Sequence, residues 1–120
     1  SKSEDNYWQY HYEYLNAVEE VNKAVDQVFL DIVMLHQKIT NDKMALTVAN
    51  EALASVERSY KAGFKDIEDV ITIRNKVFDA QTAYNNDIID YITLKLKLLQ
   101  LSGNLHEKDI ANANNYLQTQ

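Results

Sequence analysis

Arg-Ser-Tyr-Lys-Ala-Gly-Phe-Lys-Asp-Ile-Glu-Asp-Val-Ile-Thr-Ile-Arg, residues 58–74, decides the fold, because it holds the one sharp break in an otherwise continuous helical pattern. Arg58 and Lys61 precede the break, where cations stabilise the negative end of a helix dipole. Gly63 can adopt the left-handed conformation that ends a helix, and Asp66 can cap the next one. The stretch therefore predicts two helices joined by a tight reversal.

Before this break, apolar residues recur at alternating steps of four and three residues, the repeat of a coiled-coil seam. The apolar seam positions are Val18, Val21, Val25, Val28, Ile32, Leu35, Ile39, Leu46, Ala49, Leu53, Val56 and Tyr60. Asp42 is the one polar position in this run. The repeat predicts a single long helix over about residues 6–61.

After the break, a second apolar repeat predicts a helix over about residues 67–102 that closes at Gly103. Its apolar positions are Ile67, Val70, Val77, Ala80, Tyr84, Ile88, Tyr91, Leu94, Leu98 and Leu101. Because the turn at 62–66 is short, the two helices must run antiparallel.

A third, short helix is expected over about residues 105–117, because Asn104 and Glu107 have the spacing of a capping box. The predicted fold is therefore all-α, a long antiparallel coiled-coil helical hairpin with a short C-terminal helix. It forms a single domain over residues 1–120, a length that leaves no room for two.

The place of the turn also predicts the register. If the turn centres near Phe64, the numbers of facing residues sum to roughly 128, which sets Asp42 beside Asn85 and Asn86. A polar layer there would fix the register of the hairpin, as single buried polar residues do in coiled coils. The alternative is that Asp42 points to water.

The same register predicts that the first helix extends beyond the second, because Gly103 would lie opposite about Val25. The overhang would hold an aromatic cluster of Tyr7, Trp8, Tyr10, Tyr12 and Tyr14. Other apolar residues lie off the seam, at Val33, Val48, Phe78, Ile89 and Leu99. These suggest that further helices pack on the flanks of the hairpin.

Composition agrees with long helices, since the chain has no proline and only 2 glycines. It has no cysteine, which excludes disulfides and thiolate chemistry. The net charge of -6 argues against a nucleic-acid partner, which would require clustered Lys and Arg. No apolar run has the roughly twenty residues of a membrane span, and Ser1–Asp5 lacks the pattern of a signal peptide. We therefore expect a soluble chain or a piece of a larger protein.

No catalytic or metal-binding pattern is found. His11, His36 and His106 belong to no helical metal motif, so surface histidines are the expectation. Nucleophile motifs and phosphate-binding glycine loops are absent. The acidic pair Asp87 and Asp90 is expected on a solvated face, as is Glu19-Glu20. We therefore expect no enzyme, no catalytic residues, no metal and no cofactor.

Several motifs resemble the outer membrane efflux protein family, the TolC-like proteins. They are Ala49-Asn50-Glu51-Ala52-Leu53, Ser59-Tyr60-Lys61-Ala62-Gly63, Ile67-Glu68-Asp69-Val70 and Ala80-Gln81, followed by Ser102-Gly103-Asn104-Leu105 with Glu107 and Asp109. The resemblance covers nearly all of residues 14–118 and is to the second of the family's two internal repeats.

The resemblance implies a trimeric conduit for efflux or type I secretion, in which an outer-membrane β-barrel continues as a periplasmic α-helical barrel. Its partners would be a periplasmic adaptor (membrane fusion) protein and, indirectly, an inner-membrane pump. This chain would supply a periplasmic hairpin, as an excised fragment of the channel. The parent would be a homotrimer, and the fragment is expected to self-associate.

The resemblance also implies roles for residues of the turn. Ala62, Gly63, Phe64 and Lys65 match the adaptor-binding tip. Tyr60, Lys65 and Asp69 match residues that hold or line the closed entrance, whereas a further acidic position of the family is Thr72 here.

Simpler interpretations exist for most of these residues. Tyr60 can fill the end of the seam, the turn alone requires Gly63, and Lys65 and Asp69 can serve the helix dipoles and caps. An exposed Phe64 is better explained by an interface. For the whole chain, the alternative is a stand-alone coiled-coil module that scaffolds or tethers partners.

Overall fold

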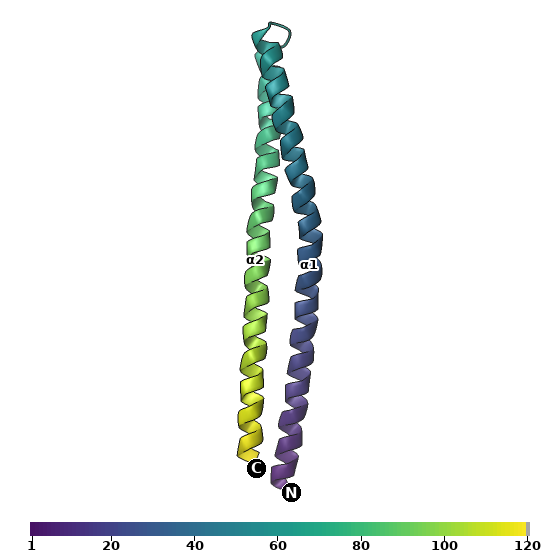
Figure 1. Cartoon of the computed structure of the whole chain (residues 1–120), viewed down its shortest axis with the longest axis vertical. Coiled ribbons are helices and arrows are strands. Elements are labelled where there is room, and N and C mark those ends of the chain that lie inside the picture. Colours follow the sequence, from purple (N-terminus) through teal and green to yellow (C-terminus); the bar gives the residue numbers. More distant parts are fainter. Residues whose placement is uncertain (120) are drawn as a thin grey trace. The chain divides into compact units, whose positions relative to one another are not determined.

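The computed structural model describes the backbone of residues 1–119 and the side chains of residues 1–118. Two helices, α1 (Lys2–Lys61) and α2 (Ile67–Thr119), account for nearly all of the described chain (Figure 1). They form the predicted all-α helical hairpin. The chain divides into two compact units, one of residues 33–92 and one of residues 1–32 together with the stretch that begins at Thr93.

The unit of residues 33–92 contains the turn and is held by the predicted seam. Leu35 and Val70 are buried, and the seam positions of α1 from Ile39 to Val56 are half-buried. Tyr60 and Ile67 differ from the prediction, with 44% and 47% of their surface exposed. Both lie beside the turn, where the partner helix has too few residues to cover them.

The other unit pairs the beginning of α1 with the end of α2. Val21 and Val28 are its buried apolar residues, again at predicted seam positions. The separate helix expected over 105–117 is wrong, because α2 continues through Gly103 to Thr119. A lone glycine inside a helix costs about 1 kcal/mol relative to alanine, which does not break a helix that its packing supports.

The overhang of the first helix is also a wrong prediction, since the uninterrupted α2 reaches the aromatic residues of α1. The Tyr14 hydroxyl donates a hydrogen bond to Oδ1 of Asp109 over 2.5 Å. This bond raises the pKa of Tyr14, because the carboxylate holds the phenolic proton in place. The Tyr7 ring meets the Tyr116 ring edge to face, with centroids 5.7 Å apart.

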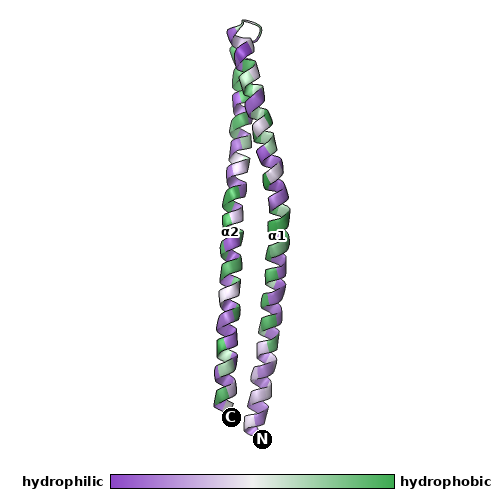
Figure 2. Cartoon of the chain, in the orientation of Figure 1, coloured by the Kyte–Doolittle hydropathy of each residue, from purple (hydrophilic) through white to green (hydrophobic). Residues whose placement is uncertain are grey.

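Each helix buries only one face, because two helices can cover only one side of each other. Figure 2 shows hydrophobic residues along both helices, interspersed with hydrophilic ones. Among the described residues, four hydrophobic side chains are buried, whereas more than five times as many large ones are exposed. The exposed set includes the off-seam positions Val33, Val48, Phe78, Ile89 and Leu99. The flanks of the hairpin are therefore apolar and open.

The same Val→Ala substitution should lower the free energy of unfolding more at a buried seam position than at an exposed position. Val70 is 1% exposed and Val33 is 66% exposed, and both lie in the unit of residues 33–92. Val70→Ala should lower the free energy of unfolding by about 2 kcal/mol, through lost burial and a residual cavity. Val33→Ala should change it by less than about 0.5 kcal/mol. Urea denaturation at low protein concentration measures both, and equal costs would contradict this assignment of the seam.

Candidate functional site

The turn between the helices is closed by a hydrogen-bonded helix cap. The Gly63 N–H donates to the Tyr60 carbonyl over 3.0 Å, and the Phe64 N–H donates to the Ser59 carbonyl over 2.9 Å. Gly63 has φ of 83°, the left-handed conformation that this Schellman arrangement requires. The end of α1 is thus fixed by backbone bonds rather than by side chains.

The start of α2 is fixed by a reciprocal capping box. The Asp69 N–H donates to Oδ1 of Asp66 over 3.1 Å, and the Asp66 N–H donates to Oδ2 of Asp69 over 3.2 Å. Each carboxylate satisfies a backbone donor that the first turn of a helix leaves open. The predicted capping role of Asp66 is confirmed, and Asp69 shares it.

The sequence-predicted tip residues lie together at the turn. Ala62, Gly63 and Lys65 are exposed, and the Phe64 side chain is 83% exposed. Lys65 and Asp69 line one groove of about 340 Å³, which Thr72 also lines. Tyr60 does not line this groove, and its backbone carbonyl belongs to the cap.

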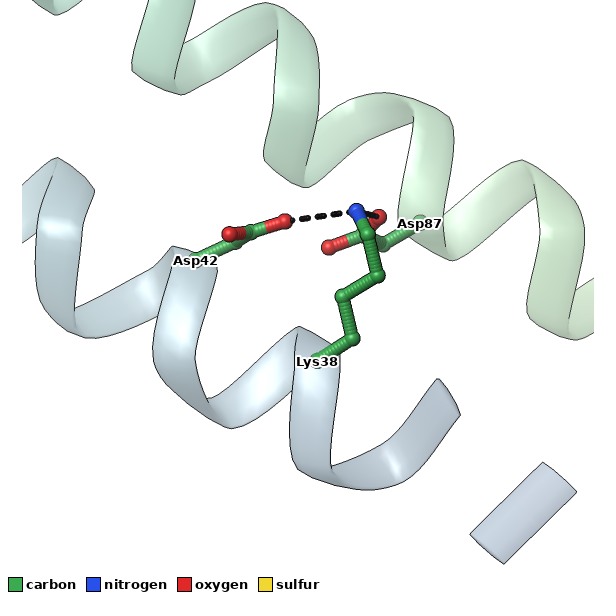
Figure 3. Close-up of polar contacts among 3 residues, drawn as sticks. All are labelled: Lys38, Asp42 and Asp87. Carbon is green, nitrogen blue, oxygen red and sulfur yellow. Dashed lines mark hydrogen bonds and ion pairs between the residues drawn. The ribbon is translucent and has the colours of Figure 1, made fainter. Parts of the chain in front are cut away.

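A second polar site lies on the seam of the same unit and consists of Lys38, Asp42 and Asp87 (Figure 3). Lys38 extends from α1, and its Nζ donates to Oδ2 of Asp42 over 2.9 Å and to Oδ1 of Asp87, on α2, over 2.5 Å. Asp87 is 1% exposed, the most buried polar residue described. We call these three residues the polar cluster.

The polar cluster corrects two predictions. Asp42 faces Asp87 rather than Asn85 and Asn86, which are exposed, and Asp87 is not on a solvated face. The neighbouring Asp90 is exposed, as predicted. The signal was in the sequence, because Tyr84, Asp87 and Tyr91 continue the steps of three and four along α2. The apolar Ile88 fits that position almost as well, so the pattern alone does not identify the buried aspartate.

The polar cluster shifts the pKa values of all three groups. Burial, followed by the neighbouring Asp42 carboxyl, raises the pKa of Asp87. The neighbouring Asp87 carboxyl, followed by the hydrogen bond from Lys38, lowers the pKa of Asp42. Hydrogen bonds to Asp87 and then to Asp42 raise the pKa of Lys38. The two carboxyl groups therefore differ in proton affinity although their side chains are identical.

Within residues 1–119, no three His, Asp or Glu side chains gather in a way that could hold a metal ion. In the same part of the chain, neither helix contains a segment long and apolar enough to cross a bilayer.

Comparison with known proteins supports the resemblance found in the turn motifs. Over 108 residues the chain is 27% identical to the outer membrane protein TolC of Vibrio cholerae. Over this stretch the chain is similar to TolC. The aligned stretch covers 84% of this chain but 25% of TolC, so the chain spans about a quarter of that relative's length. No family model and no solved structure matches the chain.

The two glycines should respond oppositely to substitution by alanine. A Cβ added at either position meets nothing within 4 Å, so only backbone conformation decides the effect. Gly63→Ala should cost about 1 kcal/mol, because an L-residue is strained at positive φ. Gly103→Ala should stabilise by about 0.5 to 1 kcal/mol, as expected inside a helix. Urea denaturation measures both, and a destabilised Gly103→Ala protein would show that α2 does not continue there.

Proposed function

We propose that this chain forms a periplasmic hairpin in the α-helical barrel of a TolC-like outer membrane channel for efflux or type I secretion. The similarity to TolC over 84% of the chain carries the proposal. The hairpin belongs to the second repeat of the channel protein, and the channel is a homotrimer in the bacterial outer membrane. The chain acts as a wall and a docking element, not as an enzyme.

The exposed flanks support a place within a larger wall. A stand-alone coiled coil would carry polar residues on the faces that its partner helix does not cover. Here those faces carry large apolar residues, such as Phe78 and Leu99, which are 70% and 67% exposed. One flank also holds a groove of about 590 Å³ lined by Ile39, Met44 and other residues. These surfaces suit neighbouring hairpins, and they also explain the expected self-association of the isolated chain.

The turn is the proposed docking point for a periplasmic adaptor protein, which in turn connects the channel to an inner-membrane pump. Phe64 is an exposed aromatic held by the cap at Gly63 and by the capping box that follows. A residue whose backbone is fixed in this way loses little backbone freedom on binding, and aromatic residues are enriched among binding hot spots. Ala62, Gly63 and Lys65 complete the contact surface.

Gating of the channel is the second role proposed for the turn. Tyr60 and Lys65 link closed hairpin tips to a neighbouring hairpin, and Asp69 lines the constricted entrance. Lys65 and Asp69 line the same groove, which brings opposite charges to one edge of the tip. Adaptor docking at Gly63 then shifts the population from closed to open packing.

Two phenylalanines should separate docking from assembly. In a full-length channel that carries this hairpin, Phe64→Ser should reduce adaptor binding at least tenfold and leave the trimer intact. Phe78→Ser should weaken the trimer instead, because this side chain lies on a flank. Co-purification with the adaptor and sedimentation of the channel measure the two effects. Normal adaptor binding by the Phe64→Ser channel would contradict the docking assignment.

A lysine substitution tests the gate. Lys65→Ala should raise the basal conductance of the full-length channel in planar bilayers several-fold, because it removes a link that holds the closed tip. Lys61→Ala is the matched control, since Lys61 is an exposed lysine in the last turn of α1. Equal conductance of the wild-type and Lys65→Ala channels would remove Lys65 from the gate.

A further inference from the structure

The buried carboxyl of Asp87 is only half satisfied. Its Oδ1 accepts the hydrogen bond from Lys38, whereas its Oδ2 is a buried oxygen without a hydrogen-bond partner among the described residues. Figure 3 shows this second oxygen on the side of Asp42. A carboxylate oxygen can only accept, and the facing carboxylate of Asp42 can only accept as well. The two ionised carboxylates therefore cannot form a hydrogen bond with each other.

The charges of the polar cluster do not cancel when all three groups are ionised. Lys38 supplies one positive charge and the two aspartates supply two negative ones, so a net negative charge remains beside a side chain that is 1% exposed. The titratable groups that face Asp87 are Lys38 and Asp42 from α1 and, one turn away in either direction on α2, Tyr84 and Tyr91. A tyrosine side chain is never cationic, so neither of them adds a positive charge.

We propose that Asp42 and Asp87 share one proton, held on Oδ2 of Asp87 and donated to the Asp42 carboxylate, and that this proton fixes the register of the two helices in the unit of residues 33–92. The proton makes the cluster neutral and gives Oδ2 its missing partner. Lys38 then bonds to both aspartates without an uncompensated buried charge.

The shared proton favours the register that the turn sets, because the rest of the seam is apolar. A slide of one heptad would move Asp87 from Asp42 to a place opposite Leu35 or Ala49. A buried carboxyl opposite an apolar side chain loses its hydrogen bonds, which is strongly unfavourable. Apolar seam residues alone would discriminate weakly between such registers, since they resemble one another.

The directions of the pKa shifts agree with this placement of the proton. Since the pKa of Asp87 is raised on folding, its stabilising contribution is present at low pH and is lost as the pH rises through that raised pKa. Since the pKa of Asp42 is lowered, its contribution is lost as the pH falls through that lowered pKa. The single-proton state thus occupies the pH range between the two titrations.

Carbon NMR of the aspartate carboxyl groups in the 120-residue chain tests where the proton lies. The ordinary pKa of an aspartate side chain is about 3.9. We expect the Asp87 resonance to titrate with a higher pKa and the Asp42 resonance with a lower one. In the Asp42→Asn protein the Asp87 titration should move down toward the ordinary range. Wild-type titrations that both fall at the ordinary value, or an Asp87 titration that does not respond to Asp42→Asn, would overturn the shared proton.

The role of the proton is tested by Asp87→Asn, whose amide can accept from Lys38 and donate permanently to Asp42. This protein should stay folded, and its melting temperature should lose the fall that the wild type shows as the pH rises through the Asp87 titration. Asp90→Asn is the matched control, because it removes an exposed aspartate three residues away and should keep the wild-type pH profile. Identical profiles for the two variants would overturn the proposal.

Register is measured separately by pulsed EPR. Spin labels attached after Asn50→Cys and Asp79→Cys would lie at exposed positions of the two helices, and the natural chain has no cysteine to interfere. A slide of one heptad moves the labels by about 10 Å along the axis. We expect one narrow distance with Asp87→Asn at every pH, and a broader distribution with Asp87→Ala or with wild type above the Asp87 titration. One narrow distance in all of these proteins would show that the proton does not fix the register.

Discussion

The structure depends on one constraint, that two helices can bury only one face of each other. The steps of three and four residues choose that face, and Val21, Val28, Leu35 and Val70 are the apolar side chains that it buries fully among the described residues. Every other apolar residue of the chain stays partly or largely exposed. So narrow a core stabilises weakly, because buried apolar area sets the hydrophobic contribution. Because burial is limited to this one face, the flanks stay apolar and exposed, the turn residues stay exposed, and the polar cluster, with its buried Asp87, lies on the seam.

The fold was largely predictable because its signals are local. A heptad repeat, a chain without proline and the pair Gly63 and Asp66 determine two helices and one reversal, and each of these signals acts within a few residues. Gly103 shows where local signals fail. A glycine at this position is typical of a helix end. Leu101 and Leu105 on either side of it are half-buried, so packing stabilises α2 and the helix continues through Gly103.

The candidate sites were predicted less evenly, for a physical reason. The turn residues were found because a turn restricts backbone conformation, and such restrictions leave recognisable residues such as Gly63. Asp87 was missed because burial of a charged residue depends on its partners across the hairpin, and a register error of one residue gave it the wrong ones. Lys38 lies outside the apolar repeat altogether, yet its long side chain reaches both aspartates. Local sequence patterns therefore predict contacts between the two helices less well than they predict the helices and the turn.

The arrangement is polar within part of the seam and apolar on the flanks, which reverses the pattern of an independent coiled coil. A buried ionisable group adds little stability compared with an apolar residue of similar size, but it can select one register among several. Exposed apolar flanks cost solubility unless another surface covers them. The buried polar cluster and the exposed apolar flanks are consistent with a hairpin that is stabilised by packing against neighbouring helices. The seam of such a hairpin mainly sets the register of its two helices. In such a wall a slip of one heptad between the two helices would move the turn by three to four residues, about 5 Å along the axis. Under the proposed function, Phe64 would then lie at a different level from the tips of neighbouring hairpins. The proposed roles of the polar cluster and of Phe64 would therefore depend on each other.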